Sequence, residues 1–130
     1  MRAESVIYAL LNASPAVAAV VGDRIYLDTR PESDPLPAIV YELVSDKPDA
    51  PRIGETETVT ARMQVNCLGN VADDLVSLRE SVRVACHNQS GTIGGSVVVW
   101  CFQDGTPHDS YDELVNAYTK SIDFIIHYLR

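Results

Sequence analysis

The stretch Glu55–Leu68 limits the possible folds of this chain more than any other segment. Apolar and polar residues alternate strictly along it, with Val59, Ala61, Met63, Val65 and Cys67 in one series and Thr58, Thr60, Arg62, Gln64 and Asn66 in the other. Because successive side chains of a strand point to opposite faces of the sheet, the pattern predicts a long strand with one buried and one polar face. A second layer must therefore cover one side of the sheet.

Helical spacing of apolar residues predicts that second layer. An amphipathic helix is expected over Arg2–Asn12, and a short helix over Pro15–Val21 with Ser14 as its capping residue. The main helix is expected to run to Cys86 from a cap at Asn70, because apolar residues recur at helical spacing between them.

Further segments rich in β-branched and aromatic residues favour strands: Arg24–Leu27, Ala38–Val44, Val97–Phe102 and Leu114–Leu129. The run Val97–Phe102 is apolar throughout, so we expect both of its faces to be covered and the strand to lie near the centre of the sheet. Prolines and glycines predict loops at Arg30–Pro37 and Asp104–Asp112. The order of elements predicts an α+β fold, with a mostly antiparallel sheet of four to five strands and two main helices packed on one face.

The chain is acidic, with 10 Lys and Arg residues against 18 Asp and Glu residues and a net charge of −8. Such a field repels phosphate backbones and anionic lipid surfaces, which argues against free binding to DNA or to a membrane. The apolar runs before Gly22 are also too short for a membrane span. Cys67, Cys86 and Cys101 form no close pair, which is typical of reduced thiols in a cytoplasm.

The sequence offers few candidates for catalysis. Cys86 and His87 are adjacent on the main helix, so their side chains point about 100° apart and cannot act as nucleophile and base for each other. Ser121, Asp123 and His127 share one face of the last strand, but residues four apart on a strand are separated by about 13 Å, beyond hydrogen-bond reach. We interpret Cys86 as a core residue and the others as surface or interface residues.

Ligand-binding motifs are equally sparse. The acidic cluster of Asp104, His108, Asp109 and Asp112 lacks the alternating ligands and the terminal Glu of a calcium-binding loop. The glycines that begin at Gly91 precede a strand and not a helix, so no helix N-terminus is expected to hold a phosphate there. We therefore predict no catalytic, cofactor-binding or metal-binding residues.

The order of several short segments resembles a known protein family. These segments are Val20–Asp28, Leu36–Glu42, Ala61–Cys67 and Ser121–Tyr128. Together they are similar to the Gly-x-Arg-Ile-Tyr turn and the successive strands of phage tail-completion proteins, which are the tail terminator or tail-to-head joining proteins of long-tailed phages and prophages. The likeness extends over essentially the whole chain.

The resemblance implies a single tail-completion domain over residues 1–130, with a tail-terminator-like fold and no enzymatic activity. It implies a structural virion component that caps the head-proximal end of the tail tube and joins it to the head connector. Such a protein would form a homo-oligomeric ring, commonly a hexamer, and DNA would pass through its lumen without specific binding. It would be found in the host bacterial cytoplasm during assembly and then in the virion tail.

We expect contacts with other copies, with the tail-tube protein or with the connector to use proline-rich loops and the polar strand face. The residues predicted for this interface are Arg30, Pro31, Pro35, Pro37, Pro48, Pro51, Arg52, Arg62 and Gln64. A small-ligand-binding or regulatory α+β domain without catalysis stays open as the alternative, because fold does not fix function. That alternative would require a pocket with converging polar groups.

Overall fold

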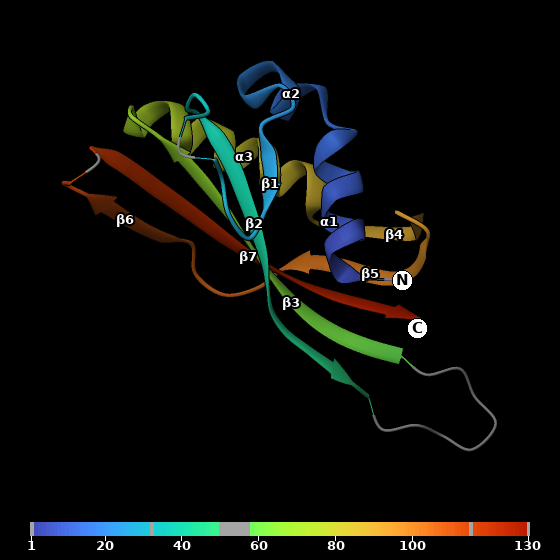
Figure 1. Ribbon diagram of the computed structural model, residues 1–130. Helices are drawn as coiled ribbons and strands as arrows, with labels where there is room; N and C mark the ends of the chain where they lie inside the picture. Colours follow the sequence, from blue (N-terminus) through green and yellow to red (C-terminus); the bar gives the residue numbers. More distant parts are fainter. Residues whose placement is uncertain (1, 32, 50–57, 115, 130) are drawn as a thin grey trace.

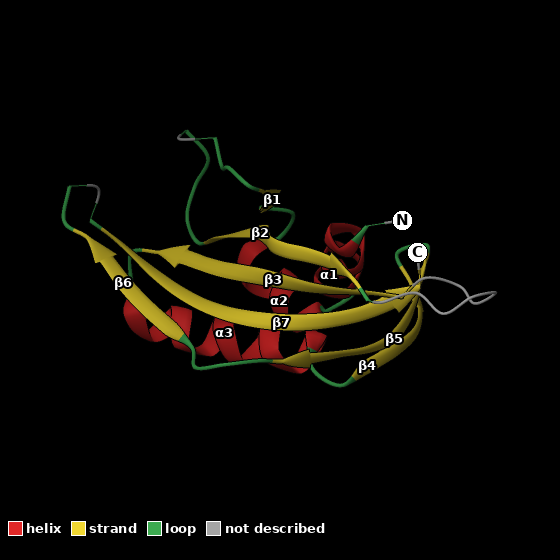
Figure 2. Ribbon diagram, turned by 90° about the horizontal axis from the view of Figure 1, so that it is seen from below, coloured by secondary structure: helices red, strands yellow, loops and turns green. Residues whose placement is uncertain are grey.

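A curled sheet with helices packed against one of its faces forms the molecule (Figures 1 and 2). The computed structural model describes residues 2–31, 33–49, 58–114 and 116–129. The helices are α1 (Ala3–Asn12), α2 (Pro15–Val21) and α3 (Ala72–Cys86). The strands are β1 (Ile25–Leu27), β2 (Ala38–Pro48), β3 (Thr58–Gly69), β4 (Gln89–Ile93), β5 (Ser96–Gln103), β6 (His108–Asp112) and β7 (Ala117–Leu129).

The sheet is mixed, and within the described residues it has seven strands in the order β1-β2-β3-β7-β5-β4, with β6 also paired to β7. β1 runs parallel to β2, and the other pairs are antiparallel. The prediction of a mostly antiparallel sheet of four to five strands is therefore wrong. β4 and β6 escaped prediction because each pairs on one side only and carries mainly polar, exposed residues, so neither has a buried periodicity.

The alternation along β3 is confirmed. Its apolar series, Val59 to Cys67, is fully buried and packs with residues of α1, α2 and α3 in one core cluster. Its polar series lies on the opposite face, which we call the open face. β7 continues the same arrangement, because Phe124 and Ile126 are buried while their neighbours Asp123, Ile125 and His127 lie on the open face.

The ends of the helices follow capping chemistry in one case and depart from it in another. Ser14 caps α2 as predicted, and its hydroxyl accepts a hydrogen bond from the Val17 amide at 3.3 Å. Asn70 does not cap α3, which begins after Val71 without a side-chain cap. The Asn70 side chain instead donates to the carbonyl of Asn116 at 2.9 Å, which ties the start of α3 to the β6–β7 hairpin.

Among the described residues, no single helix is long and apolar enough to cross a membrane. By length and composition, α1 and α2 taken together pass the same test within the described residues, but the two helices are bent by 85° at their junction.

The predicted position of β5 is wrong. The strand lies between β7 and the edge strand β4, and its open face has no covering layer (Figure 2). Val97, Val99 and Trp100 are 45%, 56% and 47% exposed. A register shift between Val98 and Trp100 places Val99 in a bulge. The apolar residues on both faces of β5 thus did not indicate burial on both faces. Their exposure on the open face needs a separate explanation.

Candidate functional site

A line of hydrogen-bonded polar side chains crosses the open face from β3 to β7. Arg62 of β3 is at its centre and donates to the carboxylate of Asp123 at 2.9 Å, and it also pairs with Asp104. The bond to Asp104, and then that to Asp123, raises the pKa of Arg62 above its ordinary value. Because Asp104 follows β5, this ion pair fixes the β5–β6 connection to the middle of the sheet.

A second group of polar contacts lies farther along the same face. Thr60 donates its hydroxyl proton to Asp49 at 2.9 Å, and its oxygen lies 2.9 Å from Nδ1 of His127. Since the one hydroxyl proton of Thr60 goes to Asp49, Nδ1 of His127 must be the donor in the second bond. Thr58 also donates to Asp49 at 2.8 Å, and these two threonine bonds, that of Thr58 first, lower the pKa of Asp49.

The residues that share a face of β7 are held by different partners on β3. Ser121 donates to Asn66 at 2.6 Å, whereas Asp123 accepts from Arg62 and His127 contacts Thr60. These side chains are thus engaged across the sheet and not with one another. Ser121 is buried, so its interpretation as a surface residue is wrong.

The three thiols are buried, and the histidine next to Cys86 is bonded to the backbone. Cys86 is fully buried, while Nδ1 of His87 accepts from the backbone amide of Gln103 at 3.0 Å. Burial raises the pKa of Cys67 and of Cys101 to about 12, and it raises the pKa of Cys86 well above its ordinary value. Because the thiolate is the reactive form, these groups are poor nucleophiles near neutral pH.

The predicted acidic cluster is divided among cations. Asp109 pairs with Arg79 at 2.5 Å and with Lys120 at 2.9 Å, and Asp104 pairs with Arg62. The bond to Lys120, and then that to Arg79, lowers the pKa of Asp109. No group of three or more His, Cys, Asp or Glu residues that could hold a metal ion occurs in the described part of the chain.

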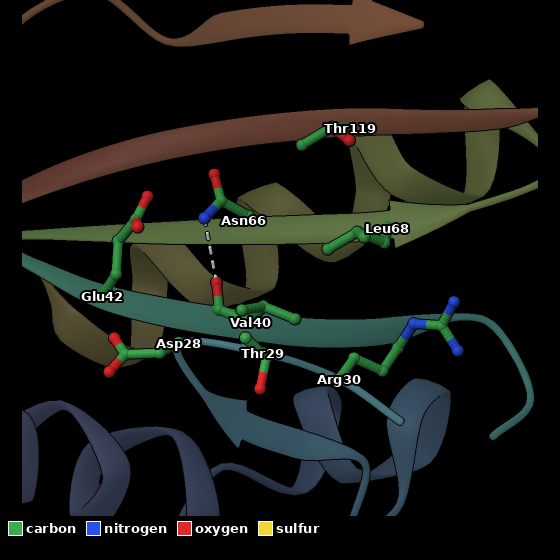
Figure 3. A pocket seen from close by; sticks show the side chains of 8 residues that line it. All are labelled: Asp28, Thr29, Arg30, Val40, Glu42, Asn66, Leu68 and Thr119. Carbon is green, nitrogen blue, oxygen red and sulfur yellow. Dashed lines mark hydrogen bonds between the residues drawn. The ribbon is translucent and has the colours of Figure 1, made fainter. Parts of the chain in front are cut away.

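An open hollow of ≈ 360 Å³ lies on the open face at the β1 side of the sheet (Figure 3). It is lined by Asp28, Thr29, Arg30, Val40, Glu42, Asn66, Leu68 and Thr119. The Asn66 amide donates to the Val40 carbonyl at 3.1 Å and is thereby occupied. Figure 3 shows the carboxylates of Asp28 and Glu42 at one end and the Arg30 guanidinium at the other, so the charged groups do not converge on one point.

An exposed apolar surface occupies the β5 side of the same face. We call it the β5 strip, and it consists of Val97, Val99, Trp100 and Phe102. The rings of Trp100 and Phe102 are 4.6 Å apart, and Trp100 Nε1 donates to the Asn88 side chain at 3.0 Å. A half-exposed Trp100 and a partly buried Phe102 beside exposed valines, held in place by such contacts, are typical of protein–protein interfaces.

The predicted interface residues fall into two places. Arg62 and Gln64 lie on the open face, where Gln64 donates to Asn66 at 3.0 Å. The others lie in or next to loops: Pro31, Pro35 and Pro48 are exposed, Pro37 is partly buried, and Arg30 lines the hollow. Pro51 and Arg52 lie outside the described residues.

Sequence reasoning missed the β5 strip. Its four members were read as a buried central strand, although they directly follow a glycine-rich turn and include both Trp100 and Phe102. Gly94 and Gly95 have positive φ and form the tight turn that joins β4 to β5. β4 is the last strand of the sheet on this side, so β5 is the second strand from the edge. The short polar segment after the main helix, which forms β4, was the signal that could have shown that β5 lies next to an edge strand.

Comparisons with known proteins bear on the whole chain. A family model described as tail completion protein gp17 matches residues 5–126. A chain in the virion of a native gene transfer agent particle superposes with a TM-score of 0.76 at 14% identity, over 98% of this chain and 95% of that one. Another solved chain superposes with a TM-score of 0.57 at 11% identity, over 100% of this chain and 96% of that one. A search of curated protein sequences finds no match.

Proposed function

Because the chain belongs to the tail completion protein gp17 family, we propose that it caps the head-proximal end of a phage tail tube and joins the tube to the head connector. In this proposal it acts as a closed ring of identical subunits. Family membership supports the coarser statement that the chain is a structural virion component. The fold it shares with a chain of a gene transfer agent virion agrees with that role.

The observation that carries the proposal is the uncovered β5 strip. A sheet face that exposes Val97, Val99 and Trp100 beside a partly buried Phe102 loses hydrophobic stabilisation unless a partner covers it. Aromatic anchors in a neutral apolar surface suit burial against another protein. We assign this partner to the last ring of the tail tube. Copies that each carry a net charge of −8 repel one another, and an uncharged strip offers no ion pairs to offset that repulsion between copies.

The acidic charge is consistent with the passage of DNA. A ring whose subunits each carry −8 repels phosphate groups, so DNA can move through the lumen without being bound. The subunit would be made in the host bacterial cytoplasm, from a phage or prophage gene, and would remain in the finished tail.

The alternative, a ligand-binding or regulatory domain, would place its site in the hollow between Arg30 and Glu42. Its opposite charges lie at opposite ends, and Asn66 is already bonded to the backbone of β2. A pocket that recognises a small molecule needs polar groups directed at a common point. The β5 strip therefore favours the assembly role over this alternative.

Substitution within the β5 strip tests the role in cells that produce the particle. Deletion of the gene for this chain should leave tails and heads unjoined. Trp100→Ser and Val99→Asp should each reproduce much of that defect while the purified variants keep the circular dichroism spectrum of the wild type. Val84→Asp is the matched control, because Val84 is 63% exposed on α3, away from the strip, and this variant should assemble normally.

Electron micrographs of lysates would count joined particles. Normal joining after deletion of the chain would refute the proposed function. Normal joining in both strip variants would leave the function in place but remove the β5 strip from it.

A further inference from the structure

The β6–β7 hairpin ends in an exposed apolar and acidic tip that projects at one end of the sheet (Figures 1 and 2). Leu114 is 95% exposed and Tyr111 is 44% exposed. Asp112 and Glu113 stand between them, are exposed, and form no ion pair with any other described residue. Among the described residues of the tip, the apolar side chain of Leu114 thus stands beside two carboxylates without a cationic partner.

The tip is held in shape by its own contacts. The Leu114 amide donates to the Asp112 carboxylate at 3.0 Å, and the Tyr111 hydroxyl bonds to the Asn116 side chain. The Tyr111 ring packs on Tyr118 at 4.5 Å between centroids. Contacts of this kind reduce the conformational entropy that the described residues 111–114 lose when they dock on a partner.

A matching hollow lies beside α3 on the helical side of the sheet. Its volume is ≈ 300 Å³, and Val76, Pro107 and Ile122 supply its apolar walls. An engineered cavity of about 150 Å³ already accommodates a benzene molecule, so this hollow has room for a leucine side chain. Arg79 and Arg83 stand at its rim.

Charge at the rim is opposite to charge at the tip. The rim cluster contains the cations Arg79, Arg83 and Lys120 and the carboxylates Glu80 and Asp109, which sum to 3 − 2 = +1. This local excess of positive charge occurs in a chain whose net charge is −8. Arg79 and Arg83 already pair with Asp109 and Glu80, and the charge of +1 that remains attracts the Asp112 and Glu113 carboxylates. Electrostatic complementarity favours the register that brings the tip and the rim together.

Leu114 does not fill the hollow of its own chain, because its side chain is 95% exposed. Pro107, at the hollow, precedes β6, whose five residues separate it from the tip. At a rise of about 3.4 Å per residue, β6 separates Pro107 from the tip by roughly 17 Å. A contact that buries Leu114 in such a hollow therefore joins different copies. Because the two surfaces differ, repetition of the contact leads from copy to copy and can close into a ring.

We propose that the tip of the β6–β7 hairpin of one subunit inserts Leu114 into the α3 hollow of the next subunit, with Asp112 and Glu113 against Arg79 and Arg83. This inference rests on the ring in the proposed function and names the contact that closes it. The partner is a second copy of this chain.

Disulfide trapping tests the contact in the intact chain. The double variant Leu114→Cys, Val76→Cys places one thiol on the tip and one in the hollow. The native cysteines are buried and give little background. The matched control is Leu114→Cys, Val84→Cys, because Val84 is also exposed on α3 but does not line the hollow. Leu114→Cys alone reports contact between two tips.

At millimolar concentration under mild oxidation, the tip–hollow pair should form a ladder of covalent oligomers. Its rate should exceed that of the control by at least about tenfold, because docking raises the effective concentration of the two thiols. Oxidation traps even short-lived contacts, so equal rates in both pairs would overturn the proposal. Rapid dimerisation of the single variant would also overturn it, since tip-to-tip contact is two-fold and does not lead to this ring.

A charge exchange gives a second readout. Glu113→Arg and Arg83→Glu should each slow cross-linking of the tip–hollow pair, and the two changes in one chain should restore it. Loss without restoration would show that these charges do not meet. If heads and tails join normally but the tip–hollow pair does not cross-link, this contact alone is refuted. If the pair cross-links into a ring but loss of the chain leaves head–tail joining unchanged, the proposed function alone is refuted.

Discussion

Substitution of Gly94 tests how closely the β4–β5 turn packs against α1. Gly94 has φ +60, and a Cβ built there would lie 2.4 Å from the Ser5 carbonyl oxygen and 2.8 Å from its carbonyl carbon. Both atoms belong to the backbone of the first turn of α1. Gly94→Ala therefore has to separate the turn from a helix that buries Val6, Ile7 and Leu11 in the core.

The size of the effect follows from two contributions. A residue with a Cβ at a left-handed φ costs about 1–2 kcal/mol relative to glycine. Forcing packed elements apart costs about 1–3 kcal/mol more. Gly95→Ala is the matched control, because Gly95 has φ +81 in the same turn but nothing within 4 Å of its added Cβ. The control should lose only the first contribution.

Urea unfolding followed by circular dichroism would measure both free energies of unfolding. Gly94→Ala should lose about 1–3 kcal/mol more than Gly95→Ala, with the same dependence on urea concentration. Equal losses in the two variants would refute the close approach of this turn to α1.

Other properties of the folded chain give further predictions. Cys67, Cys86 and Cys101 should react with a thiol reagent at neutral pH only after unfolding, because burial raises their pKa. Immediate reaction of these thiols in native buffer would contradict this prediction. Asp109 has a folded pKa below its ordinary value of 3.8, since Lys120 and then Arg79 bond its carboxylate. The stabilisation from the Asp109 ion pairs is therefore present above about pH 3.8 and is lost as the pH falls through the folded pKa. Asp109→Asn should weaken the pH dependence of the urea midpoint on the acid side. An unchanged profile would count against the ion pairs.

Sequence patterns revealed the elements that bury one regular face. β3 was predicted because every second side chain is apolar and buried, and α2 was predicted because Ser14 and Pro15 carry a clear helix-start signal. β4 and β6 gave no such signal, since each lies at an edge and exposes most of its side chains. The parallel pairing of β1 depends on how the following loop returns the chain, which residue periodicity does not encode.

The candidate surfaces were less accessible to sequence reasoning. Alternation placed Arg62 and Gln64 on the open face, but it gave no information about their partners in the sheet. The exposure of Trp100 depends on which strands flank β5, and the exposure of Leu114 depends on a hairpin whose first strand looked like a loop. Both are long-range properties of the sheet, and a local pattern of apolar residues cannot distinguish an uncovered face from a buried one.

Imaging of whole particles tests the assembly role most directly. A cryo-electron microscopy map of the particle, with the chain located by an added C-terminal tag, should place this fold in a closed ring between the last ring of the tail tube and the head connector. The β5 strip should face the tube in that map. A chain found elsewhere in the particle, or absent from it while heads and tails are joined, would contradict the proposed function.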